Sequence, residues 1–159
     1  MKSLWTTFIK SLQLPKKQAV FALNRIGMDI IVIYLFIILF ISSIPTYISQ
    51  LQANEHLSVF FFSIFFFIFH YLPVVIIVFL ALSIIAWILS LITKFAKRRL
   101  HFSILWKMAG SATTIPFLLF TILSFFYHVT SLFLVASILF VFAVVIRIIF
   151  IYPKIRHSY

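Results

Sequence analysis

Two ionisable side chains stand at or within apolar runs that are long enough to cross a bilayer. Asp29 opens the run from residue 29 to 48, and Arg147 lies in the run from 132 to 152. A charge at the centre of a membrane costs ~2.5–3.5 kcal/mol on insertion scales, so such residues are candidates for function. The two could form an intramembrane ion pair. The alternatives are that Arg147 extends to the membrane surface and that Asp29 interacts with the positive end of a helix dipole.

A second polar feature is a stretch of small hydroxyl residues before Pro116. Thr113 and Thr114 lie in this stretch. Hydroxyl groups can donate to carbonyls that a proline leaves without a hydrogen-bond donor. We expect this structural role first, with a polar groove lined by Thr113, Thr114 and Pro116 as the alternative.

The remaining ionisable residues do not form a known catalytic or metal-binding set. His56, His70 and His128 lie far apart in the sequence and lack the short spacing that makes a zinc motif specific. The chain has two acidic residues and no cysteine, so paired-carboxylate, two-metal and thiolate chemistry lack their usual groups. The sequence therefore predicts a protein that is not an enzyme and that has no metal or cofactor.

Composition points to a membrane protein. Of the 159 residues 65% are hydrophobic and 9% are charged, whereas soluble domains are roughly 45–50% apolar and about 25% charged. The formal net charge is +11, but the cations flank apolar runs, so anionic lipid headgroups, not nucleic acid, are the expected counter-surface. The candidate headgroup contacts are Lys10, Lys16, Lys17, Arg25, Lys94, Lys97, Arg98, Arg99 and Lys107.

The elements that position these residues are helices. Residues 1–28 are predicted to form a basic amphipathic segment that is interrupted at Pro15. Residues 29–159 are predicted to form the membrane domain. Its expected spans cover about 29–48, 71–93, 111–127 and 132–152.

The stretch from Leu57 to Thr93 is ambiguous. It is too long for one upright crossing and barely long enough for two. Residues 57–69 are expected to be an interfacial helix with a break at Pro73, or an extension of one long, tilted second span. Two spans remain a third alternative.

A connector is expected between the second and third spans. Leu100 to Gly110 reads as an amphipathic interfacial helix, with Ile104, Leu105 and Met108 facing the membrane. The predicted fold is therefore an all-α polytopic membrane protein, with four transmembrane helices plus amphipathic N-terminal and connector helices.

Positive charge orients this fold. Lys and Arg in short loops stay on the cytoplasmic side, and the loops predicted at residues 50–56 and 128–131 contain neither. The sequence thus predicts a multi-pass protein of the bacterial plasma membrane whose N- and C-termini are both cytoplasmic.

Short motifs resemble one known family. The resembling residues are Phe8–Ser11, Pro15, Ile26–Gly27, Tyr34, Ser43–Pro45, Leu105–Lys107 and Ala112–Pro116. On these residues the chain resembles the DUF1189 family of small membrane proteins of Gram-positive bacteria. The resemblance implies a helical membrane topology and supplies no catalytic residues. Members carry an extracytoplasmic segment between the first two spans, and this chain has only Ser49 to His56 or the Phe-rich helix in its place, so we expect a short variant.

Two function classes follow. The first is a non-enzymatic membrane accessory or scaffold protein that binds another membrane protein or anionic lipid through its basic segments. The alternative is a small transporter or channel component, as an oligomer, with Asp29, Arg147 and the 113–116 region along its path.

Overall fold

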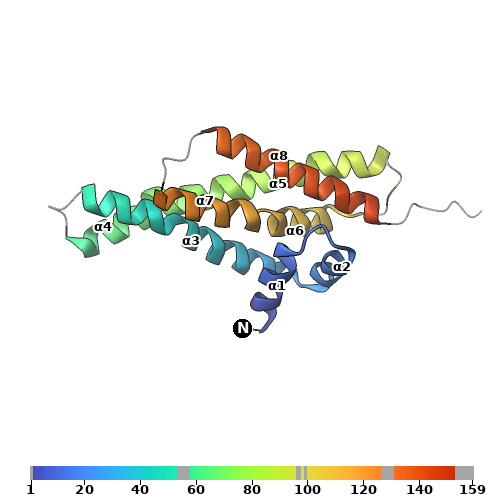
Figure 1. Ribbon diagram of the computed structural model, residues 1–159, viewed down its shortest axis with the longest axis horizontal. Coiled ribbons are helices and arrows are strands. Elements are labelled where there is room, and N and C mark those ends of the chain that lie inside the picture. Colours follow the sequence, from blue (N-terminus) through green and yellow to red (C-terminus); the bar gives the residue numbers. More distant parts are fainter. Residues whose placement is uncertain (1, 54–57, 96–97, 99, 127–130, 153–159) are drawn as a thin grey trace, which may run out of the picture.

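The chain folds into helices that run back and forth along one long axis (Figure 1). The computed structural model describes residues 2–53, 58–95, 98, 100–126 and 131–152. In chain order the elements are α1 (Lys2–Leu12), α2 (Lys17–Arg25), α3 (Met28–Ala53), α4 (Val59–Phe66), the π-helical turn η1 (Phe67–Tyr71), α5 (Leu72–Phe95), α6 (Phe102–Ala112), α7 (Thr114–Phe126) and α8 (Ser131–Ile151). The predicted all-α fold is confirmed.

Four helical stretches are long and apolar enough to cross a membrane. They are α3, the continuous helix Val59–Phe95, the helix Phe102–Phe126 formed by α6 and α7, and Leu132–Ile151 of α8. Each needs about 20 residues to cross ~30 Å of hydrocarbon, and the shortest has 20. The predicted number of four transmembrane helices is confirmed.

The four stretches alternate in direction, which brings their ends together in two groups. At one end, Ser103 Oγ donates to Met28 Sδ at 3.6 Å, and an Arg98 guanidinium nitrogen donates to Phe150 O at 3.4 Å. We call this the α2 end, because α2 packs there. At the other, the α4 end, Tyr47 and Ser63 share a hydrogen bond of 2.8 Å between their hydroxyl groups.

The second span is one long helix. It runs from Val59 to Phe95 over 37 residues. Within the stretch 57–69, residues 59–69 therefore extend this span and do not form a separate interfacial helix. The irregularity expected at Pro73 is the π-helical turn η1, in which Leu72 N–H donates to Phe67 O. A proline cannot donate a backbone hydrogen bond, and the wider turn just before it lets the helix continue.

Helix α6 lies at the centre of the fold and not at its periphery. Every residue from Leu105 to Ala112 is buried, and α6 packs against α5, α8, α3, α2, α1 and α7. The expectation that Leu105 and Met108 face the membrane is therefore wrong, since both are fully buried by other helices. The predicted connector helix exists, but it continues through Thr113 into α7 and forms the first half of the third span.

The main hydrophobic core surrounds α6 and therefore lies toward the α2 end. Helix α8 illustrates the resulting asymmetry. Its second half contributes the buried residues Val141, Val145 and Ile148, whereas Leu132 to Phe140 are exposed or half-buried. The packing is thus dense around α6 and looser where α8 begins.

Candidate functional site

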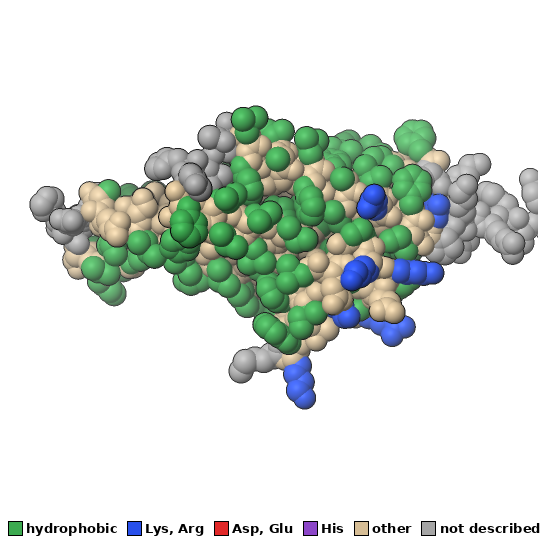
Figure 2. Space-filling view, viewed as in Figure 1, with side chains coloured by type: hydrophobic (Ala, Val, Ile, Leu, Met, Phe, Trp, Pro, Cys, Tyr) green, Lys and Arg blue, Asp and Glu red, His purple; other side chains and the backbone are tan. Residues whose placement is uncertain are grey.

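The described cations gather at the α2 end. On the face shown in Figure 2, Lys and Arg side chains lie over α1, α2 and the neighbouring helix ends, and most of the other coloured side chains are hydrophobic. The described members are Lys2, Lys10, Lys16, Lys17, Arg25, Lys94, Arg98, Lys107 and Arg147. Lys97 and Arg99 belong to the predicted headgroup contacts but lie outside the described residues. The exposed members on α1, on α2 with its preceding residue, and at the end of α5 are Lys2, Lys16, Lys17, Arg25 and Lys94. We call these five residues the basic surface.

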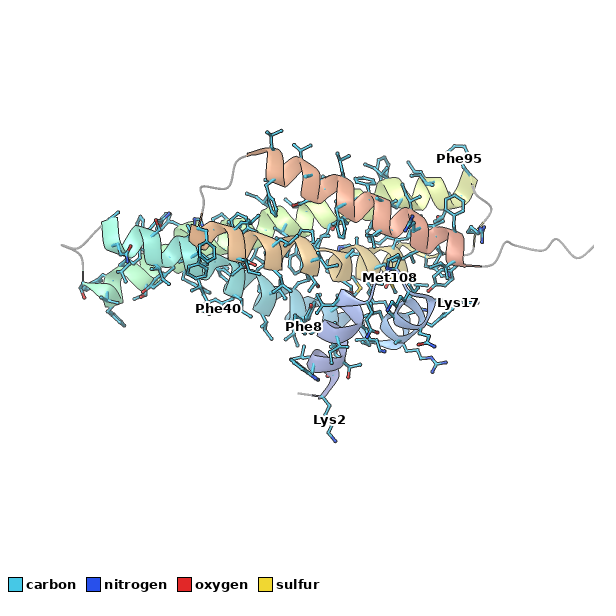
Figure 3. The ribbon with its side chains drawn as sticks, in the orientation of Figure 1. Lys2, Phe8, Lys17, Phe40, Phe95 and Met108 are labelled. Atoms are coloured by element: carbon cyan, nitrogen blue, oxygen red, sulfur yellow. The ribbon has the colours of Figure 1, made fainter. Side chains whose placement is uncertain are left out.

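Helix α1 docks on the bundle through small hydroxyl residues. Thr7 and Ser11 are 0% exposed and follow each other at helical spacing against α3, α6 and α7. Small side chains allow close helix contact. The aromatic face points outward, with Trp5 64% exposed and stacked on Phe8 at 5.7 Å between ring centroids. Figure 3 shows Lys2 extending away from the bundle at the start of this helix.

Helix α2 holds the next cations. Its apolar face, formed by Ala19, Val20 and Leu23, is completely buried against α6 and α8. The opposite face leaves Lys17 and Arg25 exposed. Because the apolar face of α2 is buried, the helix cannot rotate about its axis without exposing that face. Lys17 and Arg25 are therefore held on the outer side.

Lys107 has a different role from the one predicted. The sequence groups it with the headgroup contacts, but its side chain is only 8% exposed. Its Nζ donates to Asn24 O at 2.8 Å and to Ile26 O at 2.9 Å. These carbonyls lie at the C-terminal end of α2, where the helix dipole presents partial negative charge. Lys107 therefore fastens α2 to α6 from inside and is not available to a lipid.

Asp29 and Arg147 lie on different helices and are both exposed. Asp29 is in the first turn of α3, where a carboxylate interacts favourably with the helix N-terminus, and Arg147 lies on α8. Among the residues that the structure describes, no ion pair joins them.

The hydroxyl stretch before Pro116 divides into two roles. The Thr114 hydroxyl shares a buried hydrogen bond of 2.8 Å with the Tyr34 hydroxyl, which ties α7 to α3. Thr113 and Pro116 instead line a cavity between α3, α5, α7 and α8. Neither Asp29 nor Arg147 is among the residues that line this cavity.

His70 is the one of the three singled-out histidines that falls in the described chain. It stacks on Phe66 with 4.6 Å between ring centroids and borders the same cavity. His56 and His128 lie outside the described residues. The expectation that these histidines hold no metal remains a prediction.

Comparison with known protein families finds one match. Residues 48–150 match "Protein of unknown function (DUF1189)", which is more than half of the chain. The chain belongs to the DUF1189 family. No curated protein and no solved structure matches this DUF1189 chain.

The matched region contains only some of the residues on which the resemblance rests. Among the quoted motifs, Leu105–Lys107 and Ala112–Pro116 lie inside it, whereas those from Phe8 to Pro45 precede it. The matched region therefore contains the lysine that fastens α2 and the hydroxyl stretch that ties α7 to α3. The basic helices α1 and α2 lie outside the matched residues of this DUF1189 protein.

Proposed function

We propose that this protein is a non-enzymatic membrane scaffold whose basic surface binds the headgroups of anionic lipids. One observation carries the proposal. The cations of α1 and α2 are held outward at one end of an apolar bundle, and Asp29 is the only acidic residue among the described positions. Anionic lipids attract each Lys or Arg near a membrane surface by ~1 kcal/mol.

The aromatic face of α1 supports the same proposal. Trp5 is exposed, and Trp is enriched at the depth of lipid headgroups. An amphipathic helix with an outward apolar face and flanking lysines is typical of helices that lie in the membrane interface. Helices α1 and α2 would then rest on the bilayer surface while α3 to α8 cross it.

The proposal includes an orientation, with the α2 end on the cytoplasmic side of a bacterial plasma membrane. Because the sequence contains no cysteine, single cysteines report accessibility without background. We expect a membrane-impermeant maleimide to label Gln52→Cys, at the α4 end, in intact cells. It should label Gln18→Cys, on α2, only after the cells are disrupted. Labelling of Gln18→Cys in intact cells would refute the orientation.

Neutralising α2 tests the lipid binding. In the variant Lys16→Gln/Lys17→Gln/Arg25→Gln, three exposed cations are lost while the buried face of α2 is unchanged. At ~1 kcal/mol per charge, we expect affinity for phosphatidylglycerol to fall at least about tenfold. Native mass spectrometry of the full chain in mild detergent, titrated with phosphatidylglycerol or phosphatidylcholine, measures the effect.

Two controls define the result. The charge-conserving variant Lys16→Arg/Lys17→Arg/Arg25→Lys should bind phosphatidylglycerol as the wild type does. Added salt should weaken binding to the wild type more than binding to the neutral variant, since surface charges are screened. Equal affinity of the wild type for the two lipids would contradict the proposal.

A further inference from the structure

The cavity between α3, α5, α7 and α8 is independent of the basic surface. Its volume is about 560 Å³, within the ~300–1,000 Å³ that is usual for ligand pockets. It lies where α8 begins, on the loosely packed side of the fold. Its described lining consists mainly of apolar side chains, with five Ser or Thr hydroxyl groups and the His70 imidazole.

The cavity reaches the outer surface of the bundle between α5 and α8. Ile77 on α5 and Leu134 on α8 both line it, and they are 64% and 62% exposed. Deeper in, Leu39, Leu82 and Val141 line it and are buried. Because α5 and α8 are both among the membrane-spanning candidates, an opening between them faces lipid hydrocarbon.

Four of the five hydroxyl groups of the lining, all except that of Thr46, have partners within the protein. Ser43 Oγ donates to Leu39 O at 2.9 Å and Ser137 Oγ donates to Phe133 O at 2.8 Å. Thr113 Oγ1 likewise donates to Gly110 O at 2.7 Å. Hydroxyls that are satisfied by their own helix do not require a polar ligand. No lining residue among those described carries a permanent charge, and apolar cavities hold hydrocarbon in preference to water.

The volume decides between two apolar occupants. A helix with its side chains is about 10–12 Å across and rises 5.4 Å per turn, so one turn fills about 400–600 Å³. The enclosed volume therefore corresponds to about one helical turn, so most of a helix from a second copy or from a partner would lie outside it. A narrow, flexible hydrocarbon chain fits the same space.

We infer that the cavity binds one acyl chain of a membrane lipid, which enters between α5 and α8. The bound acyl chain fills the cavity between α7 and the first half of α8. The rings of Phe120 and Phe133, 6.1 Å apart, lie between α7 and α8 next to the inserted chain. This binding needs no headgroup charge, so it holds for zwitterionic lipid as well.

The test uses the full chain in phosphatidylcholine liposomes that include a phosphatidylcholine with a photoactivatable diazirine on one acyl chain. After irradiation, labelled residues are mapped by mass spectrometry. We expect label on the buried lining residues Leu39, Leu82 and Val141. Ile84, which is exposed on α5, reports ordinary lipid contact, and Ile31, which is buried and does not line the cavity, should stay unlabelled.

A matched pair of variants separates binding from general access. Ser137→Phe puts a ring into the cavity, and Ala136→Phe puts the same ring on the neighbouring exposed position of α8, which does not line it. Label on Leu82 should fall several-fold in Ser137→Phe and remain in Ala136→Phe. Unlabelled lining residues in the wild type, or equal label in the two variants, would overturn the inference. Because the lipid is zwitterionic, either outcome leaves the anionic-lipid proposal to its own test.

Discussion

Replacing Lys107 with Met should release α2 from the bundle while leaving the four long helices in place. The variant keeps the apolar stem of the side chain and removes both hydrogen bonds to Asn24 O and Ile26 O. Hydrogen bonds to charged groups contribute about 1.5–3 kcal/mol each, but Asn24 and Ile26 are only half-buried, so water replaces part of this contribution at the freed carbonyls. We expect a loss of about 2–4 kcal/mol in the free energy that holds α2 against α6.

Hydrogen exchange measures that loss segment by segment. Amides of α2 should exchange at least tenfold faster in Lys107→Met, since 1.4 kcal/mol corresponds to a factor of ten. Amides of α5 should change little. The control Lys94→Met removes an exposed lysine at the end of α5, and surface changes of that kind stay within about 0.5 kcal/mol. Unchanged exchange in α2 of Lys107→Met would show that its apolar face alone holds the helix.

The same variant links the internal lysine to the proposed lipid binding. If α2 is released, its three cations still attract anionic lipid, because charge near a membrane surface is sufficient for much of that attraction. We therefore expect phosphatidylglycerol binding to fall less in Lys107→Met than in the triple α2 neutralisation. Lys107 thus positions the basic surface and does not form part of it.

The sequence was sufficient for the number of spans and for the presence of helices before them. Each span is an apolar run between basic or polar flanks, and this pattern depends on local composition only. Pro15 separates α1 from α2 for an equally local reason. The single long helix from Val59 to Phe95 could not be chosen over its alternatives, since a proline can either end a helix or be accommodated by a wider turn such as η1.

Helix α6 could not be placed from its pattern, for a physical reason. In lipid, the surface of a bundle is as apolar as its core, so hydrophobic residues do not mark the inside. The two spans of highest mean hydropathy, Val59–Phe95 and Leu132–Ile151, have the smallest buried share, and Phe102–Phe126 has the lowest mean hydropathy. The small residues from Ala109 to Ala112 were the available signal of a central helix.

The role of Lys107 was hidden for a related reason. Its partners are backbone carbonyls, and every residue has one, so no particular side chain signals the contact in the sequence. The contact of α1 with the bundle was hidden as well. In the sequence, Thr7 and Ser11 resemble a solvated polar face, but both are buried. Asp29 and Arg147, by contrast, attract attention as charges, yet both stay exposed.

Gly110→Leu should weaken the bundle at the contact of α6 with α3. A Cβ atom at Gly110 would already lie 3.0 Å from Leu35 Cδ1 and 3.7 Å from Ile31 Cγ2. Leu35 and Ile31 are both fully buried, so they cannot swing outward to make room for a longer side chain. Overpacking of this kind costs typically 1–3 kcal/mol, and we expect about 3 kcal/mol here, with a clear fall in the thermal midpoint in detergent.

The smaller variant separates crowding from the loss of glycine itself. Gly110→Ala adds only the Cβ, whose close neighbour is the far end of the flexible Leu35 side chain. Ala also favours helix over Gly by about 1 kcal/mol, which offsets the tighter contact, so this variant should stay near the wild type. Ala143→Leu, at an exposed position of α8, should also be neutral.

Circular dichroism and size-exclusion chromatography of the heated protein follow all three variants. In Gly110→Leu, hydrogen exchange should first rise in α3 around Ile31 and Leu35, because those residues are displaced. Exchange in α2 should rise less, since Lys107 lies on the part of α6 that meets α2 and keeps its own bonds. A Gly110→Leu protein as heat-stable as the wild type would mean that α3 and α6 lie farther apart than the structure places them.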